Sequence, residues 1–131
     1  MELLSLTFLG FTLRYDRDRF GRGRRYLNVF PSAKAQARAR ERLRELTGPQ
    51  RNFVPITVMV NDVNRWLGGW GNYFRHGYPS AVFTQLNWSV VQRLTRRLKR
   101  RSDRPYRIPA GESSVAHLQR LGLRLLRTTT G

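Results

Sequence analysis

Apolar residues recur along this chain with two different spacings, and each spacing predicts a different kind of element. The segments SLTFLGFTLRY and RRYLNVF are rich in β-forming residues and are separated by GRG at 21–23. This pattern predicts a β-hairpin with a long basic tip over residues 14–25. Pro31 then ends the second strand, and Ser32 is a suitable N-cap for an Ala- and Arg-rich helix that runs to Leu46.

Helical spacing of apolar residues predicts the rest of the chain. The first helix has a narrow apolar face formed by Ala35, Ala39, Leu43 and Leu46. A second helix has the face Met59, Val63, Trp66, Leu67, Trp70, Tyr73 and Phe74. A third has the face Phe83, Leu86, Val90, Val91, Leu94 and Leu98, and a short last helix has Val115, Leu118, Leu121 and Leu125. We expect the aromatic residues of the second helix to lie in the core.

The predicted fold class is α+β and mostly α, with an N-terminal β-hairpin followed by a bundle of three main helices and a short C-terminal helix. The expected divisions are a hairpin over 1–30, a separate helix over 31–48, a helical domain over 56–126 and a tail over 127–131.

Glycines interrupt the aromatic face of the second helix. Gly68, Gly69 and Gly71 each cost about 1 kcal/mol relative to alanine inside a helix. Three such residues within four positions require a compensating cause. We expect the close approach of another backbone, either a neighbouring protein segment or a nucleic acid.

The charge of the chain predicts a polyanionic partner. Its 131 residues include 25 Lys plus Arg against 8 Asp plus Glu, which gives a net charge of +17. Only Lys34 and Lys99 are lysines, and arginine is suited to bidentate phosphate contacts. A GC-rich coding sequence is the alternative explanation for the excess of arginine over lysine, but it does not explain the net charge. The third helix also carries a separate basic stripe of Arg93, Arg96, Arg97, Arg100 and Arg101.

Other kinds of site find little support in the sequence. The chain has no cysteine, and its two histidines lack metal-ligand spacing, so we expect no metal or other cofactor. Asp16 and Asp18 alternate with arginines, and neither a P-loop nor a G-x-S-x-G motif is present. No apolar run approaches the roughly 20 residues that a membrane helix needs, so we expect a cytoplasmic or nucleoid-associated protein. We also expect no membrane binding, because the apolar sides of the helices are committed to a shared core.

Several motifs occur in a familiar order. They are FLGF at 8–11, PSAK at 31–34, VNRWLGGWGNYF at 63–74 and F-x-x-L-x-x-x-V at 83–90. Together they resemble the C-terminal part of group II intron-encoded reverse transcriptases, the maturases. In that family the first motif ends the polymerase palm, the second begins the thumb helix, and the third characterises the maturase-specific domain.

The resemblance assigns two sets of residues. The residues that match the family motifs are Phe8, Gly10, Phe11, Pro31, Ser32, Asn64, Gly69, Trp70, Asn72, Tyr73 and Phe74. The basic residues that we expect to contact RNA are Arg22, Arg24, Arg25, Lys34, Arg38, Arg65, Arg75, Arg93, Arg96, Arg97, Lys99, Arg100 and Arg101.

The resemblance implies that the chain binds structured RNA, in particular group II intron RNA, and helps it to fold and splice. The polymerase aspartates of the family lie upstream of FLGF, so we expect neither DNA synthesis nor target cleavage from these residues, and no catalytic residue is assigned. One alternative is a thumb that completes a reverse transcriptase whose fingers and palm lie on another chain. Another is a nonspecific nucleic-acid-binding remnant of a mobile element. A DNA target or an RNA–DNA hybrid is a further expected partner.

Overall fold

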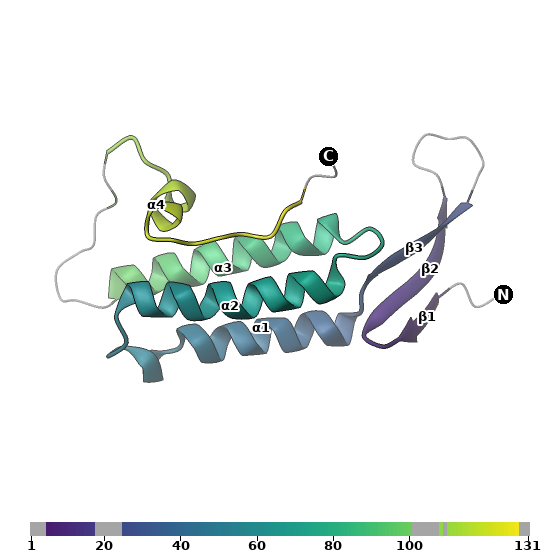
Figure 1. The fold of residues 1–131 in the computed structure, drawn as a ribbon, viewed down its shortest axis with the longest axis horizontal. Coiled ribbons are helices and arrows are strands. Elements are labelled where there is room, and N and C mark those ends of the chain that lie inside the picture. Colours follow the sequence, from purple (N-terminus) through teal and green to yellow (C-terminus); the bar gives the residue numbers. More distant parts are fainter. Residues whose placement is uncertain (1–4, 18–24, 101–107, 109, 129–131) are drawn as a thin grey trace.

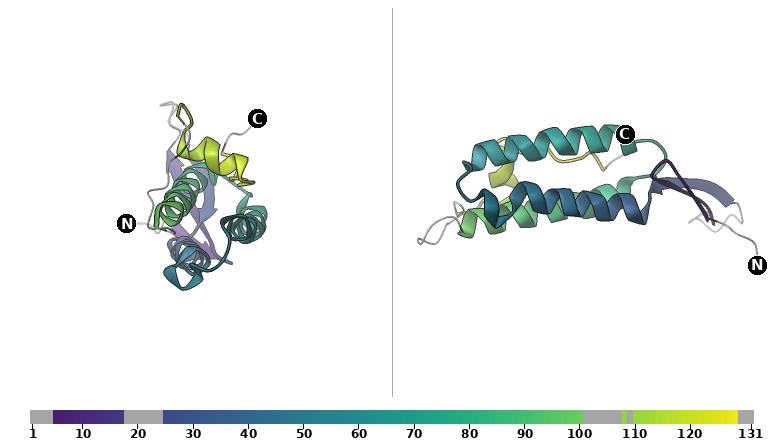
Figure 2. Two further views of the ribbon diagram at one scale, coloured as in Figure 1. Left: turned by 90° about the vertical axis from the view of Figure 1, so that its left-hand side faces the viewer. Right: turned by 90° about the horizontal axis from the view of Figure 1, so that it is seen from below.

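The computed structural model describes residues 5–17, 25–100, 108 and 110–128, and its fold is α+β and mostly α, as predicted. Three long helices lie side by side in an elongated bundle, and a small sheet projects from one end of it (Figure 1). Views from the end and from below show the same arrangement (Figure 2). Among the described residues, no helix has the length and apolar character needed to cross a bilayer.

The N-terminal sheet has one strand more than predicted. Strands β1 (Ser5–Phe8), β2 (Phe11–Arg17) and β3 (Arg25–Pro31) form an antiparallel sheet in the order β1-β2-β3. The expected hairpin is the β2–β3 pair. The additional strand arises because Leu9 and Gly10 both have positive φ angles, of 54° and 85°, and so form a two-residue turn between the paired Phe8 and Phe11.

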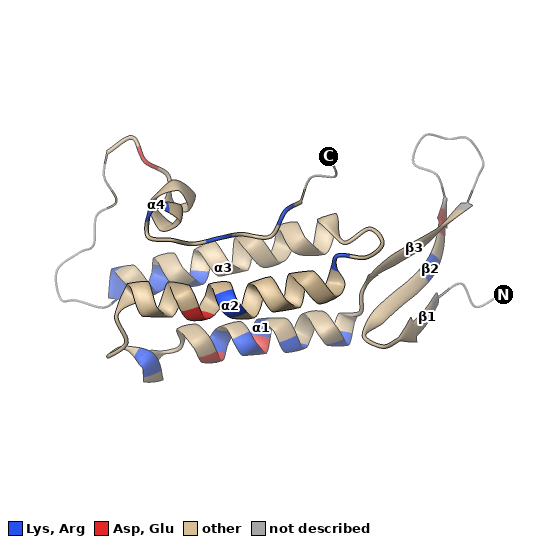
Figure 3. Ribbon diagram, in the orientation of Figure 1, with Lys and Arg blue, Asp and Glu red and all other residues tan. Residues whose placement is uncertain are grey.

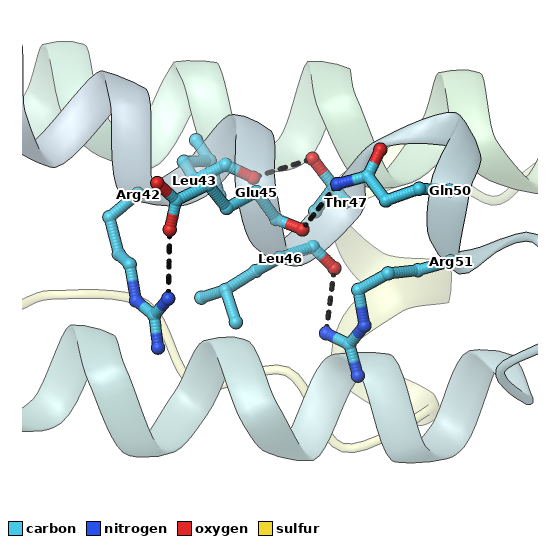
Figure 4. A network of polar contacts seen from close by, with 7 residues as sticks. All are labelled: Arg42, Leu43, Glu45, Leu46, Thr47, Gln50 and Arg51. Carbon is cyan, nitrogen blue, oxygen red and sulfur yellow. Dashed lines mark hydrogen bonds and ion pairs between the residues drawn. The ribbon is translucent and has the colours of Figure 1, made fainter.

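Helix α1 (Ala33–Thr47) has side-chain hydrogen bonds at both ends. The Ser32 hydroxyl accepts a hydrogen bond from the Ala35 amide at 3.1 Å, which confirms the predicted N-cap. At the other end, Thr47 Oγ1, Gln50 and Arg51 donate to the carbonyls of Leu43, Glu45 and Leu46, as Figure 4 shows. Glu45 and Leu46 are among the last four residues of the helix, whose carbonyls have no amide partner within it. Gln50 and Arg51, which bond to them, belong to the 3-10 helix η1 (Pro49–Arg51).

Helices α2 (Ile56–Phe74) and α3 (Ser80–Arg100) share one core with α1. The predicted apolar face of α3 is confirmed, because all six of its residues are buried. The prediction for α2 is only partly right: Met59, Val63, Leu67 and Phe74 are buried, as are Val60 and Gly71.

The remaining aromatic residues of α2 do not lie fully in the core. Trp66 and Trp70 are only partly buried, and Tyr73 is 50% exposed. The reason lies in α1, whose facing residues in this region, Ala35 and Ala39, are too small to cover the indole rings. The domain boundary expected between 48 and 56 stays a prediction, and α1 contributes Ala39 to the same core as α2 and α3.

The C-terminal region differs from the predicted helix. Helix α4 (Ser114–Arg120) ends early, and residues 122–128 continue as an extended segment along the bundle (Figure 1). We call these residues the C-terminal strap. Two asparagine side chains hold it: Asn64 donates to the Gly122 carbonyl at 2.7 Å and accepts from the Arg124 amide at 2.8 Å. Asn87 makes the same pair of bonds, each 2.9 Å long, with the amide and carbonyl of Leu126.

The glycines of α2 have different surroundings. A Cβ atom at Gly71 would overlap the side chain of Leu126, so the close neighbour at this position is a side chain of the C-terminal strap and not the backbone that the sequence predicted. At Gly68 and Gly69 a Cβ atom would meet no described residue within 4 Å. Among the described residues, packing therefore explains the glycine at position 71, whereas the backbone at Gly68 and Gly69 is uncovered and packing does not explain these two glycines.

Candidate nucleic-acid interface

The motif residues from the sheet and from α2 meet where these two parts join. The Phe11 ring lies 5.5 Å from that of Tyr73 and 5.0 Å from that of Phe74, measured between centroids. The Tyr73 hydroxyl donates to the Leu9 carbonyl at 2.8 Å, and the Ser32 amide donates to the Gly10 carbonyl at 2.8 Å. These contacts hold β1, β2 and the start of α1 in a fixed orientation against the end of α2.

A hollow of about 610 Å³ lies between α1 and α2 beside this junction. We call it the α1–α2 groove. The residues that line it are Thr7, Leu9, Gly10, Ser32, Lys34, Ala35, Arg38, Ala39, Arg42, Trp66, Trp70, Tyr73 and Phe74. The groove therefore combines cations from α1 with aromatic rings from α2, and two small alanines of α1 also line it.

The cations of the groove are available to a ligand. Lys34 and Arg38 are exposed, and no carboxylate of the described residues pairs with either. Arg42 forms an ion pair with Glu45 at 2.9 Å, in which both side chains are more than half exposed. Such an exposed pair contributes little stability and is easily exchanged for a phosphate contact. Arginine and lysine can bind phosphates here while unpaired bases stack on the exposed parts of the rings.

The groove continues toward the end of α1 into a second hollow, which shares Arg42 and Trp66 with it. In this second hollow Arg51 pairs with Asp62 at 2.6 Å, so one cation is neutralised. Arg65 also lines it, and no carboxylate of the described residues pairs with Arg65. Figure 3 shows the Lys and Arg residues spread along α1, with further ones on α2 and at the end of α3.

The predicted basic stripe on α3 needs one correction. Arg97 is 5% exposed and donates to the Asn52 side chain, so it lies inside the bundle rather than on the surface. Helical spacing placed Arg97 beside Arg93 and Arg96, but the turn that follows α1 covers this position. A buried guanidinium needs such a hydrogen-bond partner. We therefore assign Arg97 to the packing of α3 against this turn.

The other described residues of the stripe remain on or near the surface. Arg93 is partly buried, and this burial lowers the pKa of its guanidinium; the charges of Arg44 and Arg96 lower it further. Arg96, Lys99 and Arg100 are exposed and line a hollow between α3 and α4 with Trp88, which is 61% exposed. This is a second surface where cations adjoin an aromatic ring.

The other residues expected to contact RNA are dispersed. Arg75 is exposed just after α2, and Arg25 lies on β3 opposite Arg17. Arg22, Arg24 and Arg101 lie outside the described residues. RNA contact by any of these residues stays a prediction.

Among the site residues that the sequence prediction missed, Arg42 and Trp88 each had a signal in the sequence. Arg42 follows Lys34 and Arg38 at intervals of four residues, the spacing of one helical face, and all three line the groove. Trp88 stands outside the apolar spacing of α3, which marks a large aromatic residue on the surface. Within the part of the chain that the structure describes, no three His, Asp or Glu residues are grouped as metal ligands would be.

Comparison with known families identifies a match over the helical part of the chain. Residues 36–110 match the family model described as "Group II intron, maturase-specific domain". The matched range is more than half of the 131 residues and contains α2, α3 and most of α1. It includes Arg38, Arg42 and the aromatic side of the groove. A comparison with curated proteins gave no match.

Proposed function

Because the chain belongs to the group II intron maturase-specific domain family, we propose that it binds group II intron RNA and assists the folding and splicing of that RNA. The observation that carries this proposal is the α1–α2 groove, where Lys34 and Arg38, which pair with no carboxylate of the described residues, adjoin partly exposed aromatic rings. Its role is binding rather than catalysis. This function also accounts for a net charge of +17, far above what solubility requires.

The groove suits an RNA strand that is not fully paired. Residues four apart advance about 6 Å along a helix, so Lys34, Arg38 and Arg42 present three positive charges over about 12 Å of α1. This length matches a few consecutive phosphates of one strand. Trp66, Trp70 and Tyr73 lie on the opposite wall, where bases from loops or bulges can stack. Phosphate contacts thus provide affinity, while the shape of a folded RNA provides selectivity.

A competition experiment tests this function. The chain is bound to a fluorescent group II intron RNA from its own genome, with duplex DNA and an unrelated structured RNA of equal length as competitors. Salt is set at about 50 mM and about 200 mM, because purely electrostatic binding loses several orders of magnitude over this range. We expect the intron RNA to be preferred at both salt concentrations. Equal affinities that fall together with salt would leave only a nonspecific polyanion binder.

One observation favours a second function. In the register of the sheet, Leu6 and Phe8 share a face with Tyr15 and Leu27, and all four side chains are exposed. An exposed apolar face of this kind indicates contact with another protein surface. We propose that it contacts the fingers and palm of a reverse transcriptase, which the chain would complete as its thumb.

Mixing the chain with a separate finger–palm polypeptide from the same intron tests this second function. We expect DNA synthesis on an RNA template only in the mixture, and its loss when Phe8 is replaced by Glu. Synthesis that is the same with and without the chain would refute the thumb role. RNA binding by the chain alone does not depend on this outcome.

A further inference from the structure

A separate hollow of about 590 Å³ lies on α2 beside the C-terminal strap. Its lining consists of Asn61, Asn64, Arg65, Gly68, Gly69, Arg124, Leu125 and Leu126. The strap forms one wall and α2 forms the other, so residues about 60 positions apart in sequence build it together. The sequence assigned no binding role to any wall residue from the strap.

The strap is held in one register at this hollow. Asn64 bonds to the Gly122 carbonyl and to the Arg124 amide, and these two bonds fix the backbone on both sides of Leu123. Leu123 is buried, and the absence of a side chain at Gly71 makes room for Leu126. The position of Arg124 at the edge of the hollow therefore follows from the side-chain amide of Asn64.

The hollow has the residues of an anion-binding site, and two of its lining residues are glycines without side chains. Arg65 and Arg124 come from different elements, both are exposed, and no carboxylate of the described residues pairs with either. Gly68 and Gly69 line the same hollow, and no atom of the described residues stands within 4 Å of a Cβ atom placed at either. Two adjacent glycines weaken a helix, and packing among the described residues does not explain them. They leave the peptide groups of α2 accessible to a ligand that comes very close.

We propose that this hollow binds a ribose–phosphate segment of the RNA strand, with Arg65 and Arg124 on phosphates and ribose 2′-hydroxyls donating to backbone carbonyls at Gly68 and Gly69. Asn64 is a positioning residue that places Arg124. This inference rests on the proposed RNA-binding function and adds a second site to it. A ribose–phosphate strand fits because it has both the anionic groups for the arginines and a hydroxyl donor for the carbonyls.

The site is linked to the α1–α2 groove through shared lining residues. Arg65 lines this hollow and also the hollow at the end of α1, which in turn shares Arg42 and Trp66 with the groove. A strand that leaves the groove near Trp66 can therefore cross α2 at Arg65 and reach Arg124. The crossing point lies at Gly68 and Gly69, where side chains would obstruct it.

Alanine at both glycines gives the sharpest test, because stability and binding should move in opposite directions. Gly68→Ala/Gly69→Ala is expected to raise the melting temperature by several degrees and to weaken intron RNA binding by about tenfold. Thr84→Ala is the control: it lies on an exposed part of α3, where alanine raises the helix propensity and leaves the hollow unchanged. A glycine variant that binds intron RNA as tightly as the wild type would overturn the proposal.

The role of Asn64 is tested by a double-mutant cycle. Arg124→Gln and Asn64→Ala should each weaken intron RNA binding by about five- to tenfold, and the double variant should lose little more than either alone. When the bound RNA strand is replaced by its 2′-deoxy form, the loss of affinity that Gly68→Ala/Gly69→Ala causes should become smaller. Fully additive losses would overturn the positioning role. If the wild type shows no preference for intron RNA, the proposed function itself fails; if it shows one that these variants leave intact, only this site fails.

Discussion

Replacing Lys34 and Arg38 together by glutamine is expected to weaken binding of group II intron RNA by about 10- to 100-fold. Both side chains line the α1–α2 groove without a carboxylate partner among the described residues. Each lost phosphate contact releases about 0.7 to 0.9 fewer counterions, so the slope of log affinity against log salt should become shallower by about 1.4 to 1.8. Filter binding or fluorescence anisotropy at several salt concentrations measures both quantities.

The same helix provides a matched control. Arg40→Gln/Arg44→Gln removes the same charge from α1 but lies outside the residues that line the groove. We expect this pair to weaken binding by less than about threefold, through the reduced net charge alone. Equal losses from the two pairs would show that total charge, and not the groove, determines affinity. Melting temperatures for both variants would establish that neither change unfolds the chain.

Gly77→Ala is expected to destabilise the fold by about 2 to 4 kcal/mol. Gly77 has a φ angle of 80°, which is unfavourable for alanine. A Cβ atom there would also overlap the backbone of Val29. The Val29 carbonyl accepts a hydrogen bond from the Tyr78 amide at 2.8 Å, and this bond joins the α2–α3 loop to the edge of the sheet. Urea unfolding measures the loss of stability.

Gly111→Ala separates the two causes of this effect. Gly111 also has a φ angle of 80°, but no described residue lies within 4 Å of a Cβ atom at that position. Its replacement should therefore cost only the backbone strain, about 1 kcal/mol. The difference between the two variants gives the cost of the overlap between the new methyl group and Val29. Similar losses at both positions would mean that this overlap costs nothing.

Local signals predicted much of the helical part of the fold. Ser32 caps α1 because its hydroxyl can reach the amide of Ala35, a geometry set by four consecutive residues. The buried face of α3 also follows from spacing alone, since a helix with one apolar stripe can bury it in only one direction. The family motifs then pointed to the family that the comparison identified.

Features that depend on distant residues were not predictable in this way. Residues 122–126 have the apolar spacing of a helix, yet they are extended. The side chains of Asn64 and Asn87 hold them by hydrogen bonds to backbone groups that lie 39 or more positions away in the sequence. The turn at Leu9 was missed because leucine rarely adopts a positive φ angle, and a leucine at this position does not indicate a turn.

The site was predicted less well than the fold because periodicity gives the direction of a side chain and not what covers it. Arg97 belongs to the basic stripe by spacing but is covered by the turn after α1, where Asn52 accepts its hydrogen bond. Trp66 and Trp70 belong to an apolar face by spacing but remain partly exposed beside small alanines. Coverage depends on the size of residues on a neighbouring helix, which no single segment reveals.

Ultraviolet cross-linking of the chain to its intron RNA, followed by mass spectrometry of the cross-linked peptides, tests the central claim most directly. Aromatic side chains stacked on bases cross-link efficiently, so the cross-linked residues show directly where the RNA binds, and no mutation is needed. We expect cross-links at Trp66, Trp70 or Tyr73, and their loss in the Lys34→Gln/Arg38→Gln variant. Cross-links that occur only elsewhere, for example at Trp88 or on the sheet, would contradict the assignment of RNA binding to the α1–α2 groove.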